Sequence, residues 1–95
     1  MAVNLGDDMD LLNEIFQDYL GTANSILNES EGLLTAGDCE ALRRSAHTLK
    51  GCSANVGAED IRAAAYEWEL AAKAADLQKL REFHGKLKDM VAALA

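Results

Sequence analysis

The sequence predicts an all-α fold in which four helices form an antiparallel up-down-up-down bundle. Proline is absent, alanine is abundant and β-branched residues are few and scattered, so intrinsic propensity favours helix nearly throughout the chain. The three short breaks in this pattern are Gly37-Asp38, Asn55-Val56-Gly57 and Ala75-Asp76. They divide the chain into four helices. Because short loops make consecutive helices antiparallel neighbours, a bundle is the simplest arrangement that buries all four apolar stripes.

The first helix is expected to run from about Asp8 to Thr35, and Gly37 marks its end. Its inward stripe recurs at helical spacing and consists of Leu12, Ile15, Phe16, Tyr19, Ala23, Ile26, Ser30 and Leu33. Residues 1–7 are expected to be a flexible N-terminal segment of a single domain that spans residues 1–95.

The second helix follows Asp38, whose carboxylate can cap its N-terminus, and Gly57 suits the position just after its C-terminus. Its inward face is expected to consist of Leu42, Ser45, Ala46, Leu49, Cys52, Ser53 and Val56. Glu59 and Asp60 then open the third helix, where negative charge is favourable because the N-terminal end of a helix dipole is positive.

The third and fourth helices carry the apolar stripes that complete the predicted core. The third stripe consists of Ile61, Ala64, Ala65, Trp68, Ala71 and Ala72, and the fourth of Leu77, Leu80, His84, Leu87, Val91 and Leu94. Trp68 is therefore interpreted as a core residue rather than a ligand platform. His84 is interpreted as a partly buried bundle residue rather than a metal ligand.

Charge and composition exclude several classes of protein. The 16 acidic residues outnumber the 9 basic ones, which argues against binding to nucleic acid or anionic membranes because both require a basic surface. No apolar run approaches the roughly 20 residues of a membrane span, and no Lys or Arg precedes Arg43 as a secretory signal would require. Cys39 and Cys52 form no CxxC motif, so neither a disulfide framework nor a metal site is indicated. The chain is therefore expected to be soluble and cytoplasmic.

His47 is the residue on which the functional prediction depends. On the second helix the inward residues lie within roughly 60° of Leu49, whereas His47 lies about 160° away, so its side chain should face solvent. The stretch between positions 41 and 58 contains no acidic residue. The basic residues in that stretch, all near His47, are Arg43, Arg44 and Lys50. The sign of the charge is therefore reversed locally in an acidic chain.

A histidine in this setting can carry a phosphoryl group. Imidazole is largely neutral near pH 7, and its unprotonated ring nitrogen attacks without a deprotonation step. A phosphoryl group adds about two negative charges, which Lys50 and the arginines would stabilise in the product and in the transition state. Gly51, one turn after His47, should cost the helix roughly 0.5 to 1 kcal/mol relative to alanine. The space that it leaves for a phosphoryl group and a docked partner gives a reason for that cost.

The residues from Ala46 to Ala58, AHTLKGCSANVGA, resemble the signature of the histidine phosphotransfer (HPt) domain family, AHxLKGxSxxxGA. The resemblance covers about residues 8 to 94, and its further matches downstream are Ile61, Ala65, Trp68 and Glu69. It implies that His47 is the phosphoacceptor, that Lys50 stabilises the phosphoryl group and that Gly51 clears its approach. His84 lies on the apolar stripe of the fourth helix, which argues against a second phosphoacceptor there.

The resemblance implies a phosphorelay intermediate that accepts a phosphoryl group from a receiver-domain aspartate or a kinase and passes it to another receiver aspartate. The expected partners are response-regulator receiver domains and a sensor histidine kinase. The chain itself is expected to be a monomeric carrier without kinase activity, metal or cofactor, because the receiver would supply the acidic pocket and its Mg²⁺. It resembles the HPt modules of hybrid sensor kinases more than the chemotaxis-kinase type.

Two alternatives stay open. One is a non-catalytic four-helix adaptor that binds receiver domains without transfer, although the presence of Lys50 and Gly51 speaks against it. The other is a phosphotransfer region that belongs to a larger kinase.

A partner surface is expected beside His47. Candidates on the flank of the first helix are Leu20, Asn24 and Leu27, which either form a docking contact or widen the core stripe. Candidates on the second helix are Arg43, Arg44 and Ala54, of which the two arginines could equally be ordinary solvated charges. Tyr66 and Leu70 form an exposed pair on the third helix that marks another contact or none.

Overall fold

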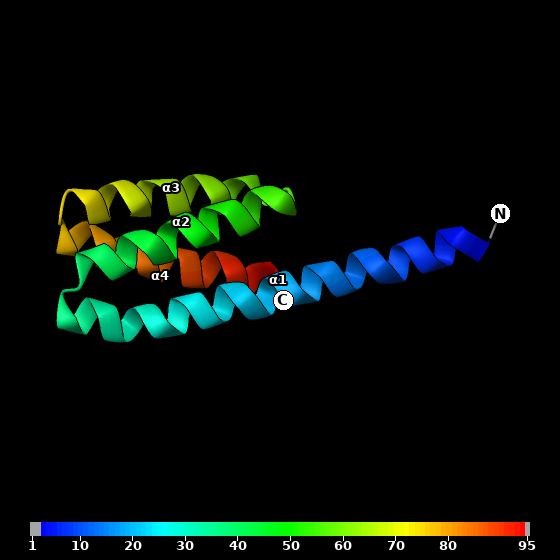
Figure 1. The fold of residues 1–95 in the computed structure, drawn as a ribbon, viewed down its shortest axis with the longest axis horizontal. Helices are drawn as coiled ribbons and strands as arrows, with labels where there is room; N and C mark the ends of the chain where they lie inside the picture. The colour runs from blue at the N-terminus through cyan, green and yellow to red at the C-terminus, as the bar shows by residue number, and fades with distance from the viewer. Residues whose placement is uncertain (1–2, 95) are drawn as a thin grey trace.

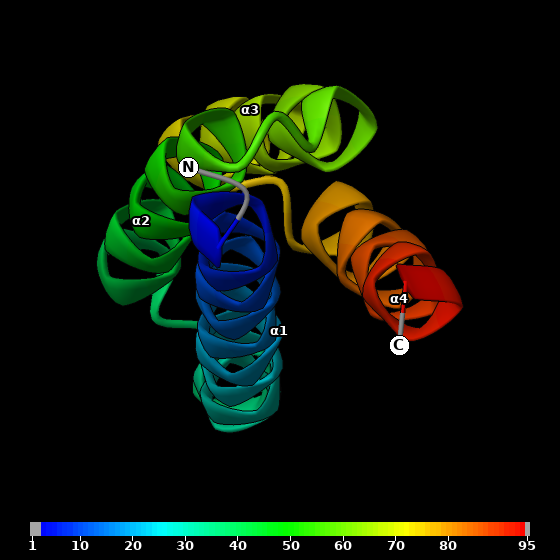
Figure 2. The same cartoon turned by 90° about the vertical axis from the view of Figure 1, so that its right-hand side faces the viewer.

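The computed structural model describes residues 3–94, and the side chains of residues 13–94, as a bundle of four helices. Their bounds are α1 Val3–Ala36, α2 Cys39–Asn55, α3 Glu59–Lys73 and α4 Leu77–Leu94. Figure 1 shows that successive helices run in opposite directions. The view along the bundle in Figure 2 shows how α2 and α4 each lie beside both α1 and α3. The predicted all-α bundle is therefore confirmed, and its helix order agrees with the up-down-up-down arrangement.

The first helix, α1, is longer than expected. It begins at Val3 rather than Asp8, so the backbone of residues 3–7, expected to be flexible, is helical, while residues 1 and 2 lie outside the described residues. At 1.5 Å per residue its 34 residues extend about 51 Å, and its N-terminal part projects past the other three helices (Figure 1). The start was predicted wrongly because no proline or glycine pair in this stretch forces a helix boundary.

The buried face of α1 is also turned relative to the predicted stripe. The buried residues of this helix are Tyr19, Leu20, Ala23, Leu27, Ser30 and Leu34. Ile26 and Leu33 are only half-buried and Ile15 is exposed, whereas Leu12 lies outside the described side chains. The reason is that α1 packs against α2 on one side and α4 on the other. Its inward face must serve both neighbours and is therefore shifted toward the line of leucines spaced seven apart.

The ends of α2 follow the signals that the sequence carries. Asp38 caps its N-terminus as predicted, since its Oδ1 accepts a hydrogen bond from the backbone N–H of Ala41 at 3.1 Å. Gly37 and Gly57 have φ angles of +70° and +75°, a left-handed conformation that a side chain makes costly. The turn at Gly57 brings α3 directly beside α2, and this pairing of the two helices positions the site.

Trp68 and His84 anchor the centre of the bundle. Trp68 is completely buried, and its Nε1–H donates a hydrogen bond to the carbonyl oxygen of Leu80 at 3.1 Å. His84 is buried beside it, and its Nε2 donates to the carbonyl oxygen of Leu27 at 2.7 Å, because a carbonyl oxygen only accepts. Both residues therefore belong to the core, as predicted. Leu94, expected on the same inward face of α4, is exposed at the end of the helix.

Across the part of the chain that the structure describes, no helix is long and apolar enough to cross a membrane. The same residues include no group of three or more His, Cys, Asp or Glu side chains that could hold a metal ion. Cys39 and Cys52 are both free thiols and half-buried.

Candidate functional site

His47 stands on the outward face of α2, as its position in the helix predicts. The buried face of α2 is formed by Leu42, Ala46, Leu49 and Ser53, at the spacing of a single helical stripe. The His47 side chain points away from that stripe and is 68% exposed. Its imidazole is therefore accessible to a partner protein.

A buried carboxylate from α3 holds the inner nitrogen of this imidazole. Oε2 of Glu69 lies 3.2 Å from Nδ1 of His47, and Oε1 of the same carboxylate accepts a hydrogen bond from Nζ of Lys50 at 2.8 Å. The Glu69 side chain is only 5% exposed, whereas that of Lys50 is 27% exposed. One carboxylate thus bridges the histidine and the lysine, and it ties α3 to α2 at this level of the bundle.

The charge state of Glu69 determines which nitrogen of His47 carries the proton. The hydrogen bond from Lys50 lowers the pKa of Glu69, and the weaker hydrogen bond from His47 acts in the same direction, while burial opposes both. The carboxylate is therefore ionised near neutral pH and can only accept hydrogen bonds. Nδ1 of His47 must donate the proton in this contact. In a neutral ring Nε2 is then unprotonated, and its lone pair is available as a nucleophile.

Gly51 lies one turn beyond His47 on the same exposed side of α2. A β-carbon built at this position meets no atom within 4 Å, so packing inside this chain does not require glycine there. The only space that a side chain would occupy is outside the bundle, beside the imidazole. The prediction that Gly51 clears the approach to His47 is consistent with this geometry.

The predicted cationic patch is partly neutralised in the folded chain. Lys50 is paired with Glu69, and Arg43 forms an ion pair with Glu40 at 2.6 Å on the exposed surface. The hydrogen bond from Arg43 lowers the pKa of Glu40. The absence of acidic residues from this stretch of sequence therefore does not hold for the folded surface. Glu69 of α3 lies beside Lys50, and Glu40 in the first turn of α2 lies beside Arg43. Arg44 is exposed and lies at the edge of a hollow described next.

Two shallow adjoining hollows lie between α1 and α2, on the side of α2 that carries Thr48. They share Ile26, Glu29 and Thr48 as lining residues. Small residues of α1, Gly21 and Ser25, widen one of them. The sequence did not predict these hollows, because they depend on how α1 is rotated against α2.

The candidate docking residues divide into two groups. Leu20 and Leu27 are buried in the core, at 6% and 1% exposure, so their assignment to a docking surface was wrong and their alternative role, widening the core, is correct. Asn24 and Ala54 are exposed. The rotation of α1 is the reason, because it turns the two leucines inward and leaves Asn24 on the outside.

Glu69 is the site residue whose role the sequence did not reveal. It was recognised only as a match to the family, although a signal was present: Ala65 and Ala72, both buried, lie four residues before it and three after it on α3. An acidic side chain within an apolar stripe must be paired if it is buried. Its partners could not be named from sequence because the contact to His47 spans 22 residues and two helices.

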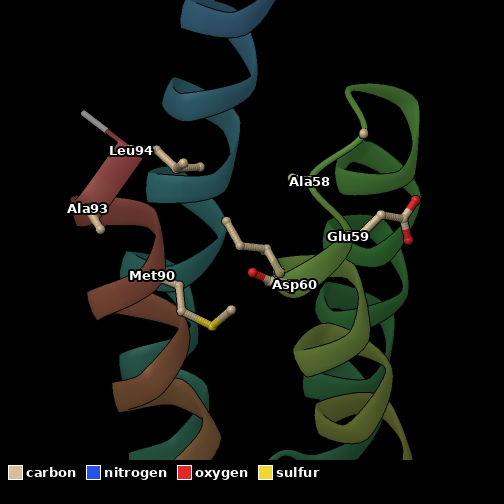
Figure 3. A pocket seen from close by; sticks show the side chains of 8 residues that line it. Ala58, Glu59, Asp60, Met90, Ala93 and Leu94 are labelled. Atoms are coloured by element: carbon tan, nitrogen blue, oxygen red, sulfur yellow. The ribbon is translucent and has the colours of Figure 1, made fainter.

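A separate hollow at one end of the bundle involves none of these residues. It lies between the start of α3 and the end of α4 (Figure 3), where its lining includes Glu59, Asp60, Met90 and Leu94. It combines carboxylates with apolar side chains and contains neither a histidine nor a basic group. It is therefore not a second candidate for the chemistry at His47.

The fold and the site define a helical domain that exposes one imidazole to solvent from the second helix of a four-helix bundle. The sequence model of the Hpt domain family matches residues 14–95, which is most of the chain. The chain therefore belongs to the Hpt domain family, whose members are phosphocarriers in histidine phosphorelays. No curated protein and no solved structure matches the chain significantly.

Proposed function

We propose that Nε2 of His47 accepts a phosphoryl group from the aspartyl phosphate of a receiver domain, or from a kinase, and passes it to an aspartate of another receiver domain. The observation that carries this proposal is the contact between Nδ1 of His47 and the buried carboxylate of Glu69. It supports a tautomer in which the inner nitrogen holds the proton. The nucleophilic nitrogen is then on the exposed side of the ring.

The transfer step from a receiver requires no base at Nε2. The lone pair of Nε2 attacks phosphorus, the N–P bond forms, the P–O bond to the aspartyl carbonyl group breaks, and the aspartate leaves as a carboxylate. The ring gains positive charge as the N–P bond forms. The adjacent Glu69 carboxylate stabilises that charge, in the way that a buried aspartate stabilises the imidazolium of a serine-protease triad. Transfer onward reverses these steps on a second receiver.

Lys50 supplies positive charge for the phosphoryl oxygens. Its ammonium group shares the Glu69 carboxylate with His47, which keeps it beside the ring before the phosphoryl group arrives. A lysine has three N–H donors on a flexible stem, so it can turn one of them to the phosphoryl group while it stays near Glu69. The Glu69 carboxylate thus keeps the Lys50 ammonium group beside His47 and restricts the conformations of the lysine side chain.

The partners in this proposal are response-regulator receiver domains and a sensor histidine kinase, and the chain acts as a monomeric carrier. The receiver supplies the acidic pocket and its Mg²⁺, and this chain contributes the nucleophile and the lysine. The receiver docks over the outward face of α2 and the adjoining hollows between α1 and α2, where Arg44 lines one hollow and Ala54 lies two turns beyond His47. The exposure of these two residues and the open space at Gly51 support this docking face.

Phosphate transfer from a phosphorylated receiver domain tests the proposal. We expect the wild-type chain to take up label that is acid-labile and base-stable, as a nitrogen-linked phosphoryl group is, and His47→Gln to take up none. His84→Gln is the matched control, because His84 is the only other histidine and it is buried; once its folding is verified by circular dichroism, it should still accept label. Receivers that bind without transfer would favour the adaptor alternative. Label retained by His47→Gln would overturn the assignment.

A further inference from the structure

Tyr66 is a large aromatic residue that the bundle leaves exposed directly beside the site. Its side chain is on α3, three residues before Glu69, and it is 45% exposed. The Nζ atom of Lys50 lies 5.2 Å from the centre of the Tyr66 ring, within the distance of a cation–π contact. The ammonium group is therefore held from two sides, by the Glu69 carboxylate and by the face of an aromatic ring.

The two contacts differ in how they would respond to a phosphoryl group. The hydrogen bond to Glu69 uses an N–H of Lys50 and competes with any phosphoryl oxygen for that donor. The ring attracts the positive charge as a whole and requires no particular N–H direction. When a donor of Lys50 turns toward the phosphoryl group, the contact with the ring can persist. The ring also confines a long side chain that otherwise has many rotamers available to it.

We propose that Tyr66 is a positioning residue for phosphotransfer, whose ring keeps the Lys50 ammonium beside His47 while its hydrogen bonds exchange between Glu69 and the phosphoryl group. This inference rests on the proposed function of His47 and Lys50. It differs from a docking role for the exposed Tyr66–Leu70 pair, because a docking residue would act on the affinity for the receiver. A positioning residue acts on the transfer step itself and only through Lys50.

The transfer rate from a phosphorylated receiver, measured at subsaturating and saturating receiver concentrations, tests this role. Tyr66→Leu keeps an apolar side chain but removes the ring, and we expect it to lower the saturating rate by about two- to fivefold, which corresponds to an exposed cation–π contact. Tyr66→Phe keeps the ring and should retain most of the rate. In a Lys50→Met background, Tyr66→Leu should cause no further loss of rate.

Other outcomes of the kinetics would overturn the proposal. An unchanged saturating rate with a raised KM would show that Tyr66 is a docking contact, and an equal loss in the Lys50→Met background would show that it acts independently of Lys50. A Tyr66→Phe variant as slow as Tyr66→Leu would exclude the ring face as the cause.

A nuclear magnetic resonance measurement separates this inference from the proposed function. The ring current of Tyr66 should shift the ε-methylene protons of Lys50 upfield in the unphosphorylated chain, Tyr66→Leu should remove the shift, and Tyr66→Phe should preserve it. Absence of that difference would overturn the role of Tyr66 even if transfer to His47 occurs. Conversely, failure of any receiver to phosphorylate His47 would overturn the proposed function even if the contact is present.

Discussion

Glu69 and His47 are linked by a 3.2 Å contact between a buried carboxylate on α3 and an exposed imidazole on α2. The contact connects the buried interior of the bundle to its exposed surface. Because the ionised carboxylate only accepts hydrogen bonds, it determines the tautomer of the ring and presents Nε2 to solvent. The same carboxylate bonds Lys50, so one side chain positions both the imidazole and the ammonium group.

Replacement of Glu69 by glutamine should slow transfer more than it disturbs the fold. Glu69→Gln keeps the shape of the side chain but loses the negative charge that stabilises the developing imidazolium and fixes Nδ1–H. Hydrogen bonds to charged groups contribute about 1.5 to 3 kcal/mol, so the transfer rate should fall by roughly tenfold or more. The rate from a phosphorylated receiver, together with the ¹⁵N shifts of His47, provides the measurement. An unchanged rate with a mixed tautomer would contradict the role of the charge.

Stability should depend on the ionisation of Glu69 at acidic pH. Its pKa in the folded chain lies below the ordinary value of 4.5, chiefly because of the hydrogen bond from Lys50. The unfolded chain therefore binds the proton more readily than the folded chain does. The ionised Glu69 carboxylate stabilises the folded chain fully above pH 4.5, and this stabilisation is lost as the pH falls through the lowered pKa. Denaturant unfolding of wild type and Glu69→Gln across this range checks the sign. The difference in the free energy of unfolding between the two proteins should shrink on acidification. A difference that stays constant with pH would refute the role of the ionised carboxylate.

Gly51 should be replaceable without loss of stability but not without loss of transfer. It lies within α2 with no atom near a built β-carbon, so Gly51→Ala should raise the free energy of unfolding by about 0.5 to 1 kcal/mol. Gly51→Leu should remain folded yet slow transfer at least several-fold, because its side chain would occupy the approach to His47.

A glycine on another helix provides the control for Gly51. Gly85 lies within α4, exposed and equally free of neighbours, and Gly85→Leu should leave transfer unchanged. Equal rates for Gly51→Leu and the wild type would show that the space beside His47 is not used.

The sequence was sufficient for the three breaks between the helices and for the outward position of His47. Gly37 and Gly57 adopt left-handed backbone conformations that glycine permits at little cost, so the breaks around α2 follow from the local sequence. The exposure of His47 likewise follows from the periodicity of one helix. These features depend on neighbours within a few residues, which is why they could be predicted.

The unpredicted features depend on how the helices meet. The rotation of α1 follows from its simultaneous contact with α2 and α4, and it decides that Leu27 is buried and Ile26 is half-buried. The pairing of Glu69 with His47 depends on the register between α2 and α3. Neither relation is encoded by the periodicity of a single helix, so only a three-dimensional structure reveals them.

The rotation of α1 leads to opposite predictions for two residues that the sequence placed on the same flank. Leu27 is almost completely buried and its carbonyl group accepts the hydrogen bond from His84. Leu27→Ala should lower the free energy of unfolding by about 2 to 5 kcal/mol, because it removes a packed side chain and leaves a cavity. Once folded, this variant should bind a receiver domain with the wild-type affinity, since the leucine does not reach the surface.

Asn24 is exposed on the same helix, so Asn24→Ala should change the free energy of unfolding by less than about 0.5 kcal/mol. Ser25 is exposed and lines one of the hollows between α1 and α2, so a bulky charged replacement there, Ser25→Arg, should weaken receiver binding measured by titration calorimetry. Glu67→Arg, at an exposed position on α3, introduces the same side chain away from the hollows between α1 and α2 and serves as the control. If both arginine variants bound the receiver with the wild-type affinity, the docking face would have to lie elsewhere. If Leu27→Ala were as stable as the wild type, the assignment of Leu27 to the core would be wrong.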